Sequence, residues 1–305
     1  MKWKPVATVL GLLVTSLTAM AESILLPERL FFSQTLNAER RVRVALPASY
    51  SQGGGLRYPV LYLHDGQNVF SSAGPDASFG WGSWQADRTA AASAAAGRAR
   101  EVILVAIDNT PQRYLEYRGP SLSGATSADQ AHLRYARFLI QDLKPAIDRE
   151  FRTLPDPQHT AVLGSSMGGL CSLVLAWNHP EVFGSAASLS GAFQVERTQF
   201  LSRVLGPYRG SRKPVRLYLD SGVVDYTGGD DGAALTRRVV ERLRAIGWRT
   251  EQDLKHVVDA HPRSPEQSAA AGLPESKWKE AQTSQHNEFY WRLRFGQALE
   301  FIFPP

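Results

Sequence analysis

Short apolar runs alternate with amphipathic segments along most of the chain. Runs that are apolar at every position, rather than at every second one, are typical of parallel strands buried on both faces. A strand is also expected over 253–258, and a shorter one over 42–45 precedes a glycine-rich surface loop at 51–56. The runs of this kind lie at 60–63, 102–107, 161–163, 186–189 and 215–219, where Ser188 and Arg216 are the polar exceptions.

Helical patterning fills the intervals between these runs. The segment 131–151 carries apolar residues at helical spacing, and Gly247 ends a helix predicted over 235–246. Strands that alternate with helices predict an α/β fold, a mostly parallel sheet with helices on both faces. Further helices are predicted over 84–96, 167–178 and 288–303.

The first residues have the build of a secretory signal peptide. Lys2 and Lys4 give a basic start, an apolar stretch follows, and Ala19-Met20-Ala21 is a small-x-small cleavage pattern. The stretch is short and diluted by polar residues for a membrane anchor, which is the alternative. We therefore predict that residues 1–21 are a signal peptide and that the exported protein, periplasmic or secreted, is a single domain over 22–305.

Composition refines this picture. The 305 residues are 43% apolar and 21% charged, which are globular proportions. The net charge is +5, and cleavage would remove two lysines and no acid, which lowers it to +3. A charge this small does not predict a nucleic-acid partner. Because no further apolar run is long enough to cross a bilayer, stable membrane insertion is not predicted either. Cys171 is the single cysteine, so no disulfide can form within the chain.

One motif carries chemistry. Residues 164–169 read Gly-Ser-Ser-Met-Gly-Gly, between a buried apolar run and a predicted helix. They match G-x-S-x-G, the nucleophile elbow, which makes Ser166 the nucleophile and the N–H of Met167 an oxyanion donor. A glycine-rich turn without chemistry is the alternative, but the strand and helix on either side favour the elbow. A phosphate loop is not favoured, because leucine rather than lysine follows the motif.

A serine hydroxyl needs a base, and in this fold the order along the chain is serine, acid, histidine. Of the histidines after Ser166, His179 lies just past the elbow helix and His256 lies inside a predicted strand. His286 directly precedes the last helix, where a loop can hold its ring over the carboxyl edge of the sheet. We predict His286 as the base, with His261 as the alternative.

The acid is expected in the loop after the strand at 215–219. A carboxylate there would orient the imidazole and stabilise its protonated form. We predict Asp225, just past the strand end, and keep Asp230 and Asp231 as alternatives. Asp220 is expected to support the turn. The loop lacks the spacing of an EF-hand, and this chemistry requires neither a metal nor an organic cofactor.

Together these pieces resemble the putative-esterase family of α/β-hydrolases, over about residues 26–303. That family includes feruloyl and acetyl-xylan esterases of the carbohydrate esterase family 1 type, siderophore esterases, S-formylglutathione hydrolases and mycolyltransferases. Besides the elbow, the resemblance rests on the opening strand at 40–47, the oxyanion-type loop at 64–70, Trp84 with Asp87, Arg113 with Glu116 and Tyr117, and 286–288 with Trp291.

The resemblance implies an α/β-hydrolase fold and a serine carboxylic-ester hydrolase that forms an acyl-enzyme on Ser166. It implies a second oxyanion N–H near Gly66 or Gln67. The substrate would be a small-molecule or glycan-linked ester: feruloyl, acetyl, siderophore or small aryl. Acyl transfer to a sugar or another alcohol is the alternative, and a binding protein without activity is a more distant one.

Two further expectations concern the pocket. Trp81 and Trp84 are predicted to wall it, with core packing as an equal alternative. The segment 260–285 separates the last strand from His286 and is rich in proline, serine, alanine and charged residues. We expect it to be an inserted loop, forming a mobile flap beside the histidine.

Overall fold

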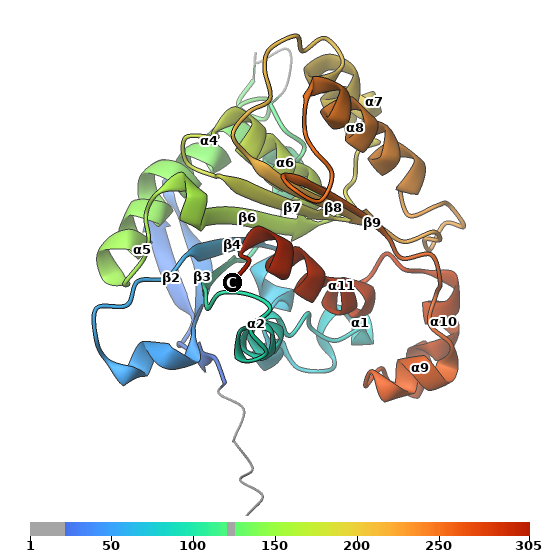
Figure 1. Ribbon diagram of the computed structural model, residues 1–305, viewed down its shortest axis with the longest axis horizontal. Helices are drawn as coiled ribbons and strands as arrows, with labels where there is room; N and C mark the ends of the chain where they lie inside the picture. The colour runs from blue at the N-terminus through green and yellow to red at the C-terminus, as the bar shows by residue number, and fades with distance from the viewer. Residues whose placement is uncertain (1–21, 121–125) are drawn as a thin grey trace, which may run out of the picture.

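A nine-stranded sheet crosses the centre of the molecule, and helices cover both of its faces (Figure 1). The computed structural model describes residues 22–120 and 126–305, so the predicted signal peptide lies outside the described residues. The strands are β1 (Ile24–Leu25), β2 (Arg29–Ser33), β3 (Ala38–Leu46), β4 (Val60–His64), β5 (Ile103–Ile107), β6 (Thr160–Ser165), β7 (Ser185–Leu189), β8 (Arg216–Ser221) and β9 (Leu254–Val258).

The strand order is β1-β3-β5-β4-β6-β7-β8-β9, with β2 also paired to β3. Strands β4 to β9 run parallel, whereas β3 is antiparallel to β5 and carries β1 and β2 along its other edge. Each predicted strand corresponds to one of these, and the prediction of a mostly parallel sheet is confirmed. The sequence pattern missed β1 and β2, which are short and half exposed.

The helices carry the apolar stripes that bury the sheet. Those within the described ranges are α1 (Ala77–Gly80), α2 (Ala86–Ala95), α3 (Arg113–Tyr117), α4 (Ala131–Arg137), α5 (Lys144–Glu150), α6 (Met167–Asn178), α7 (Val195–Gln199), α8 (Ala233–Ile246), α9 (Pro265–Ala270), α10 (Trp278–Thr283) and α11 (Glu288–Ile302). A π-helical stretch, Phe138–Leu143, joins α4 to α5, so the helix predicted over 131–151 is nearly continuous.

Strand β4 shows why the buried runs lack alternation. Val60 and Tyr62 belong to the core cluster on the side of α6 and α8, whereas Leu61 and Leu63 belong to the cluster under α2 and α11. All four are at most 1% exposed. Because both faces of the sheet are covered, every position of such a strand is apolar. Figure 1 shows the two helix layers on opposite sides of the sheet.

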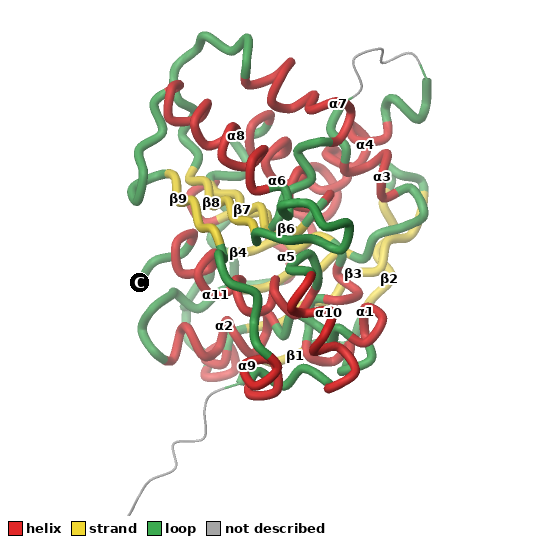
Figure 2. Tube along the Cα trace, turned by 90° about the vertical axis from the view of Figure 1, so that its right-hand side faces the viewer, coloured by secondary structure: helices red, strands yellow, loops and turns green. Residues whose placement is uncertain are grey.

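The segment predicted as a loop at 260–285 instead contains α9 and α10. Ser264 and Gln267 form a capping box at the start of α9. Leu273 and Ala281 pack with the α11 residues Phe289 and Tyr290 in a small core of their own. Figure 2 shows both helices on the α11 side of the sheet. The few apolar positions in this polar segment therefore suffice to fold it against α11.

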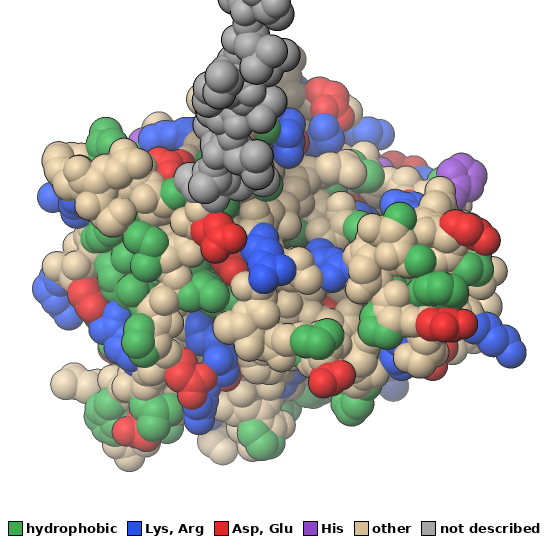
Figure 3. Space-filling view, turned by 90° about the horizontal axis from the view of Figure 1, so that it is seen from below, with side chains coloured by type: hydrophobic (Ala, Val, Ile, Leu, Met, Phe, Trp, Pro, Cys, Tyr) green, Lys and Arg blue, Asp and Glu red, His purple; other side chains and the backbone are tan. Residues whose placement is uncertain are grey.

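The surface shows no strong charge segregation on the face seen in Figure 3. Basic and acidic side chains are interspersed there with apolar ones. Across residues 22–120 and 126–305, no helix has the length and hydropathy needed to cross a bilayer.

Candidate active site

Ser166 occupies a strained turn between β6 and α6. Its backbone has φ 53° and ψ −120°, a conformation that a residue with a Cβ rarely adopts. Two hydrogen bonds hold the turn: Ser166 N–H donates to Leu189 O and Ala192 N–H donates to Ser166 O, both at 2.9 Å. The half-buried hydroxyl is thereby presented above the carboxyl edge of the sheet.

The flanking glycines explain how α6 can begin directly after the strand. A Cβ on Gly164 would lie 2.6 Å from the backbone of Gly168. A Cβ on Gly168 would in turn lie 3.1 Å from the Cβ of His64. The two glycines of the G-x-S-x-G motif thus allow a close approach on each side of the serine, to backbone at Gly164 and to the His64 side chain at Gly168.

His286 lies within hydrogen-bonding distance of Ser166. Its Nε2 is 2.9 Å from Ser166 Oγ. Asn287 caps the start of α11 by accepting from Tyr290 N–H. This cap fixes the position of His286, the residue directly before it. The ring packs edge-on against Trp291, at 5.1 Å between centroids. The structure therefore brings the predicted nucleophile and the predicted base together.

The carboxylate beside His286 is Asp231, which corrects the prediction of Asp225. Asp231 Oδ1 lies 2.6 Å from His286 Nδ1. Asp225 instead closes its own turn, where its Oδ1 accepts from the N–H groups of Thr227 and Gly229. Asp231 is 2% exposed and has φ 51°, which turns its side chain inward. No feature of the sequence distinguishes the loop's carboxylates in this respect.

The other candidates have different surroundings. Asp230 caps the start of α8, where it accepts from Gly232 N–H and Ala234 N–H. His261 is exposed, and its described hydrogen bond is made by its carbonyl oxygen, which accepts from Arg263. His261 is thus not brought to Ser166 by any described contact.

A buried polar network lies beneath Asp231, and the sequence reading missed most of it. Asp231 Oδ2 accepts from Ser190 Oγ at 2.7 Å and from Gly222 N–H at 2.5 Å. Ser190 Oγ accepts from Arg294 Nη2 at 2.8 Å. Burial raises the pKa of Asp220, which adjoins Arg294, to about 6. Arg294 lies on α11, the helix that begins just after His286. Its place on that helix was the one sequence feature that could have indicated a position near the site.

The predicted oxyanion donors lie on two neighbouring segments. Met167 is the first residue of α6, so its N–H has no acceptor within the helix. Gln67 is the second residue of a 3₁₀ turn, Gly66–Asn68, that follows β4. The close approach of Gly168 to His64 and Asp65 brings this turn beside the elbow. Both segments therefore present N–H groups near the serine.

Ionic contacts fix the conformation of the loop at 64–68. Asp65 has left-handed backbone angles, φ 57° and ψ 45°. Arg113 donates to both of its carboxylate oxygens, at 2.7 and 2.8 Å, and Asn109 donates to one of them. A Cβ on Gly66 would lie 2.6 Å from the backbone nitrogen of Ile107. The loop can therefore pack against β5 only with glycine at this position.

His64 is a structural group of the same region rather than a base. It is fully buried, and its Nδ1 lies 2.9 Å from the hydroxyl of Tyr135. Burial lowers the pKa of His64 to about 3, so the ring is neutral at physiological pH.

A cleft of about 310 Å³ opens beside His286. Its walls include Trp81, Tyr226 and the polar side chains of Glu280 and Thr283. Trp84 does not reach it, which corrects that part of the predicted pocket. Trp84 is 2% exposed and packs against Trp291 and Phe295 beneath the site, because it enters the core just before α2.

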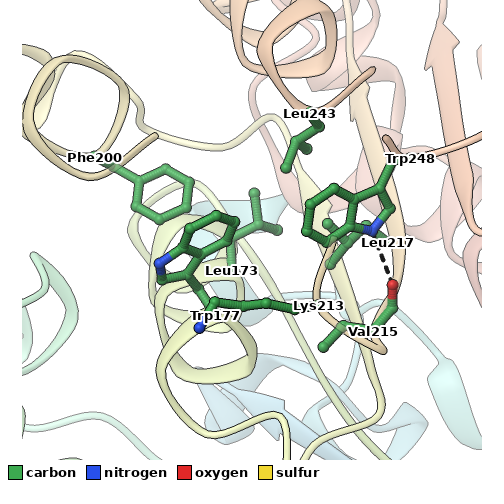
Figure 4. Close-up of a pocket in the computed structure, with 8 residues that line it drawn as sticks. All are labelled: Leu173, Trp177, Phe200, Lys213, Val215, Leu217, Leu243 and Trp248. Atoms are coloured by element: carbon green, nitrogen blue, oxygen red, sulfur yellow. Dashed lines mark hydrogen bonds between the residues drawn. The ribbon is translucent and has the colours of Figure 1, made fainter. Parts of the chain in front are cut away.

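The cavity in Figure 4 is a packing defect by comparison. It holds about 10 Å³, room for roughly one water molecule. Trp177, Phe200 and Trp248 project into it from α6 and its neighbours, and the Trp248 indole donates to Val215 O. Within the described ranges, no three His, Cys, Asp or Glu side chains are grouped so that they could hold a metal ion.

Several known proteins are similar to this chain in sequence or in fold. The Uncharacterized protein YbbA of Bacillus subtilis (strain 168) is 27% identical over 160 residues, which are 52% of this chain and 58% of that protein. An Endo-1,4-beta-xylanase/feruloyl esterase of Xylanibacter ruminicola is 28% identical over 172 residues, 53% of this chain and 21% of that protein. The chain thus matches only part of the length of these relatives.

A solved ferulic acid esterase shares the fold. It superposes with a TM-score of 0.65 at 20% identity, over 92% of this chain and 98% of that one. The predicted α/β-hydrolase fold is thereby confirmed. The sequence profile of the family described as "Putative esterase" matches residues 33–302. Because this match spans most of the sequence, the chain belongs to the putative esterase family.

Proposed function

We propose that this protein is an exported serine hydrolase of carboxylic esters. One observation carries the proposal: Ser166, His286 and Asp231 form an unbroken hydrogen-bonded chain, with contacts of 2.9 and 2.6 Å. A nucleophile, a base and an orienting carboxylate in that order constitute a catalytic triad. Membership of the putative esterase family supports the same reaction class.

In the proposed mechanism, neutral His286 takes the Ser166 proton through Nε2 as Oγ attacks the ester carbonyl. Asp231 holds the ring through Nδ1 and stabilises the imidazolium that forms. His286 then returns the proton to the departing alcohol. Water, activated by the same imidazole, attacks the acyl-enzyme and releases the acid.

The tetrahedral intermediate carries its negative charge on the former carbonyl oxygen. The N–H of Met167 and the N–H of Gln67, or that of Gly66, would donate to it. The N-terminus of the twelve-residue helix α6 adds a favourable field at the same point. These donors are backbone groups on a fixed turn, so they need little rearrangement during reaction.

For the substrate, we propose an ester with an aromatic acyl or alcohol group. Trp81 and Tyr226 offer flat apolar surfaces beside His286, and the Tyr226 ring is 6.1 Å from the imidazole. The polar residues at the rim of the cleft suit a sugar or a peptide-like remainder. The names of two similar proteins, a ferulic acid esterase and a xylanase/feruloyl esterase, support testing feruloyl esters first.

The function is tested with a panel of feruloyl, acetyl, catechol-siderophore and small aryl esters on the protein without residues 1–21. Ser166→Ala should abolish hydrolysis and labelling by a fluorophosphonate probe. Ser165→Ala, which changes the adjacent buried serine, is the matched control and should retain both. Loss of labelling in the control but not in Ser166→Ala would refute the assignment. An added alcohol acceptor that yields a transesterified product would favour acyl transfer instead.

Export is part of the proposal and has its own test. The basic start, the apolar stretch and the Ala19-Met20-Ala21 pattern predict cleavage before Glu22. Expression in a bacterial host, fractionation and N-terminal sequencing should find Glu22 as the first residue outside the cytoplasm. Full-length protein in the cytoplasm would argue against it.

A further inference from the structure

Arg294 is a buried cation next to two buried carboxylates. It is 2% exposed, while Asp220 is fully buried and Asp231 is 2% exposed. Arg294 Nη1 lies 3.3 Å from Asp220 Oδ1 and 3.8 Å from Asp231 Oδ2. Buried charges are costly unless paired, so a set of three in one place calls for an explanation.

Ser190 joins the three groups. Its hydroxyl accepts from Arg294 Nη2 and donates to Asp231 Oδ2, and its N–H donates to Asp220 Oδ1 at 3.1 Å. Its backbone is left-handed, with φ 45°, directly after β7. The carboxylate that touches His286 is thus connected through one hydroxyl to a charge system that no substrate can reach.

The charges of this system do not cancel while His286 is neutral. One arginine faces two carboxylates, which leaves a net charge of about −1 beneath the imidazole. Protonation of His286, which the proposed mechanism requires when the serine attacks, brings the whole set to neutrality. We propose that Arg294 and Asp220 are positioning residues that set the basicity of His286 through Asp231.

Other charged and titratable groups face this system. Tyr218 faces Asp220 from β8, and burial raises the pKa of Tyr218 well above its usual range. Asp225 acts on His286 from its own loop. The charge of Asp259 also raises the pKa of Tyr218, and Asp259 is paired with Arg263. None of these groups is itself substituted in the test, and Asp220 and Arg294 both act on the pKa of Tyr218.

The net charge beneath the imidazole predicts an order of His286 pKa values among the variants, which a purely structural role for Arg294 and Asp220 would not predict. With both carboxylates ionised, which for Asp220 requires a pH above its raised pKa, Arg294→Met leaves about −2 beneath the ring, Asp220→Asn leaves about zero, and the double variant returns to about −1. A more negative surrounding raises the pKa of the imidazole, and a less negative one lowers it. The acidic limb of the activity profile should therefore move up in Arg294→Met, down in Asp220→Asn, and back in the double variant.

The experiment measures the apparent pKa of His286 in two ways. One is the pH dependence of kcat/KM with the best ester of the panel. The other is an NMR titration of the His286 ring in the Ser166→Ala background, which does not depend on turnover. Each single variant should shift the value by about one pH unit, in opposite directions, and the double variant by less than half of that. Arg294→Lys, which keeps the charge, should stay close to wild type.

A matched control is a second buried arginine–carboxylate pair, Arg40 and Glu116, which are 5% and 6% exposed and bonded at 2.7 and 2.9 Å. Arg40→Met and Glu116→Gln should lower stability without moving the His286 value. Equal values in all variants, or a double variant no closer to wild type than the singles, would overturn the inference. If Arg294→Met does not fold, Asp220→Asn against the double variant decides it. If no ester is hydrolysed, the titration still tests the charge ordering, so the two failures are distinguishable.

Discussion

Replacing Asp231 with asparagine tests the candidate triad with the least change of shape. Asp231 Oδ2 already accepts two hydrogen bonds, from Ser190 Oγ and from Gly222 N–H. The amide oxygen of asparagine should take that place, because an NH₂ group there would face a backbone donor. The NH₂ group would then point at His286 Nδ1 and donate to it. The ring would carry its proton on Nε2 and could no longer accept from Ser166.

The expected loss follows from this change of tautomer. The contact between His286 Nδ1 and Asp231 is 2.6 Å, and the substitution also removes the charge that stabilises the imidazolium. Reversal of an equivalent hydrogen bond in serine hydrolases lowers kcat by about 10⁴-fold, which corresponds to about 5 kcal/mol of barrier. We expect a fall of about 10³ to 10⁴-fold in kcat, with KM changed only a few-fold.

The assay is steady-state hydrolysis of an ester from the panel, with circular dichroism to verify folding. Asp225→Asn, six residues earlier in the same loop, is the matched control and should keep at least a third of wild-type kcat/KM, because Asp225 only closes its own turn. An Asp231→Asn variant that retains a tenth or more of wild-type kcat would contradict a role for Asp231 in the triad. A larger loss of activity in Asp225→Asn than in Asp231→Asn would contradict it equally.

Three further predictions concern stability and the cleft. Gly164→Ala should lower the free energy of unfolding in urea by about 3 kcal/mol, because its Cβ would meet backbone at 2.6 Å. Gly55→Ala, whose Cβ would have nothing within 4 Å, should change that free energy by at most about 0.5 kcal/mol. Similar losses in the two variants would contradict the close contact at Gly164. Burial lowers the pKa of His132 to about 4, below its unfolded 6.5, so the stability it contributes is lost as pH falls. His132→Gln should therefore reduce the loss of unfolding free energy between pH 7 and 5 by about 2 kcal/mol, and an unchanged loss would disprove this. Trp84→Ala should lower the unfolding free energy by about 3 to 5 kcal/mol, because Trp84 is buried in the core. Trp81→Ala should raise KM for aryl esters and leave stability nearly unchanged, because Trp81 lines the cleft. The opposite pattern would contradict the placement of the two rings.

The parallel core of the fold could be predicted because its signal is local. A strand buried on both faces must be apolar at each position, and the run at 60–63 meets that condition and becomes β4. The elbow helix begins and ends where predicted, at Met167 and Asn178. The hairpin that contains β2 escaped prediction, since Leu30 and Phe32 remain more than half exposed and give no clear alternation of buried positions.

The segment 260–285 illustrates a different limit. Its composition indicates a loop, yet α9 and α10 form there because Tyr290 of α11 supplies what the segment lacks. The Tyr290 hydroxyl donates to Ala281 O and accepts from Arg263 N–H, both at 2.6 Å. Those bonds join residues up to 27 positions apart, beyond the reach of any periodicity argument.

The sequence by itself predicted those residues whose position along the chain is restricted by the chemistry. The elbow motif predicted Ser166 as the nucleophile, and chain order with a position before the last helix predicted His286 as the base, because these features follow from the fold's connectivity. Only the tertiary structure decided which carboxylate meets the histidine. Asp225, Asp230 and Asp231 are chemically identical and lie within seven residues, and the backbone turn at φ 51° directs Asp231 alone toward the ring. The same holds for Arg294, whose role depends on neighbours brought from β7 and β8 by folding.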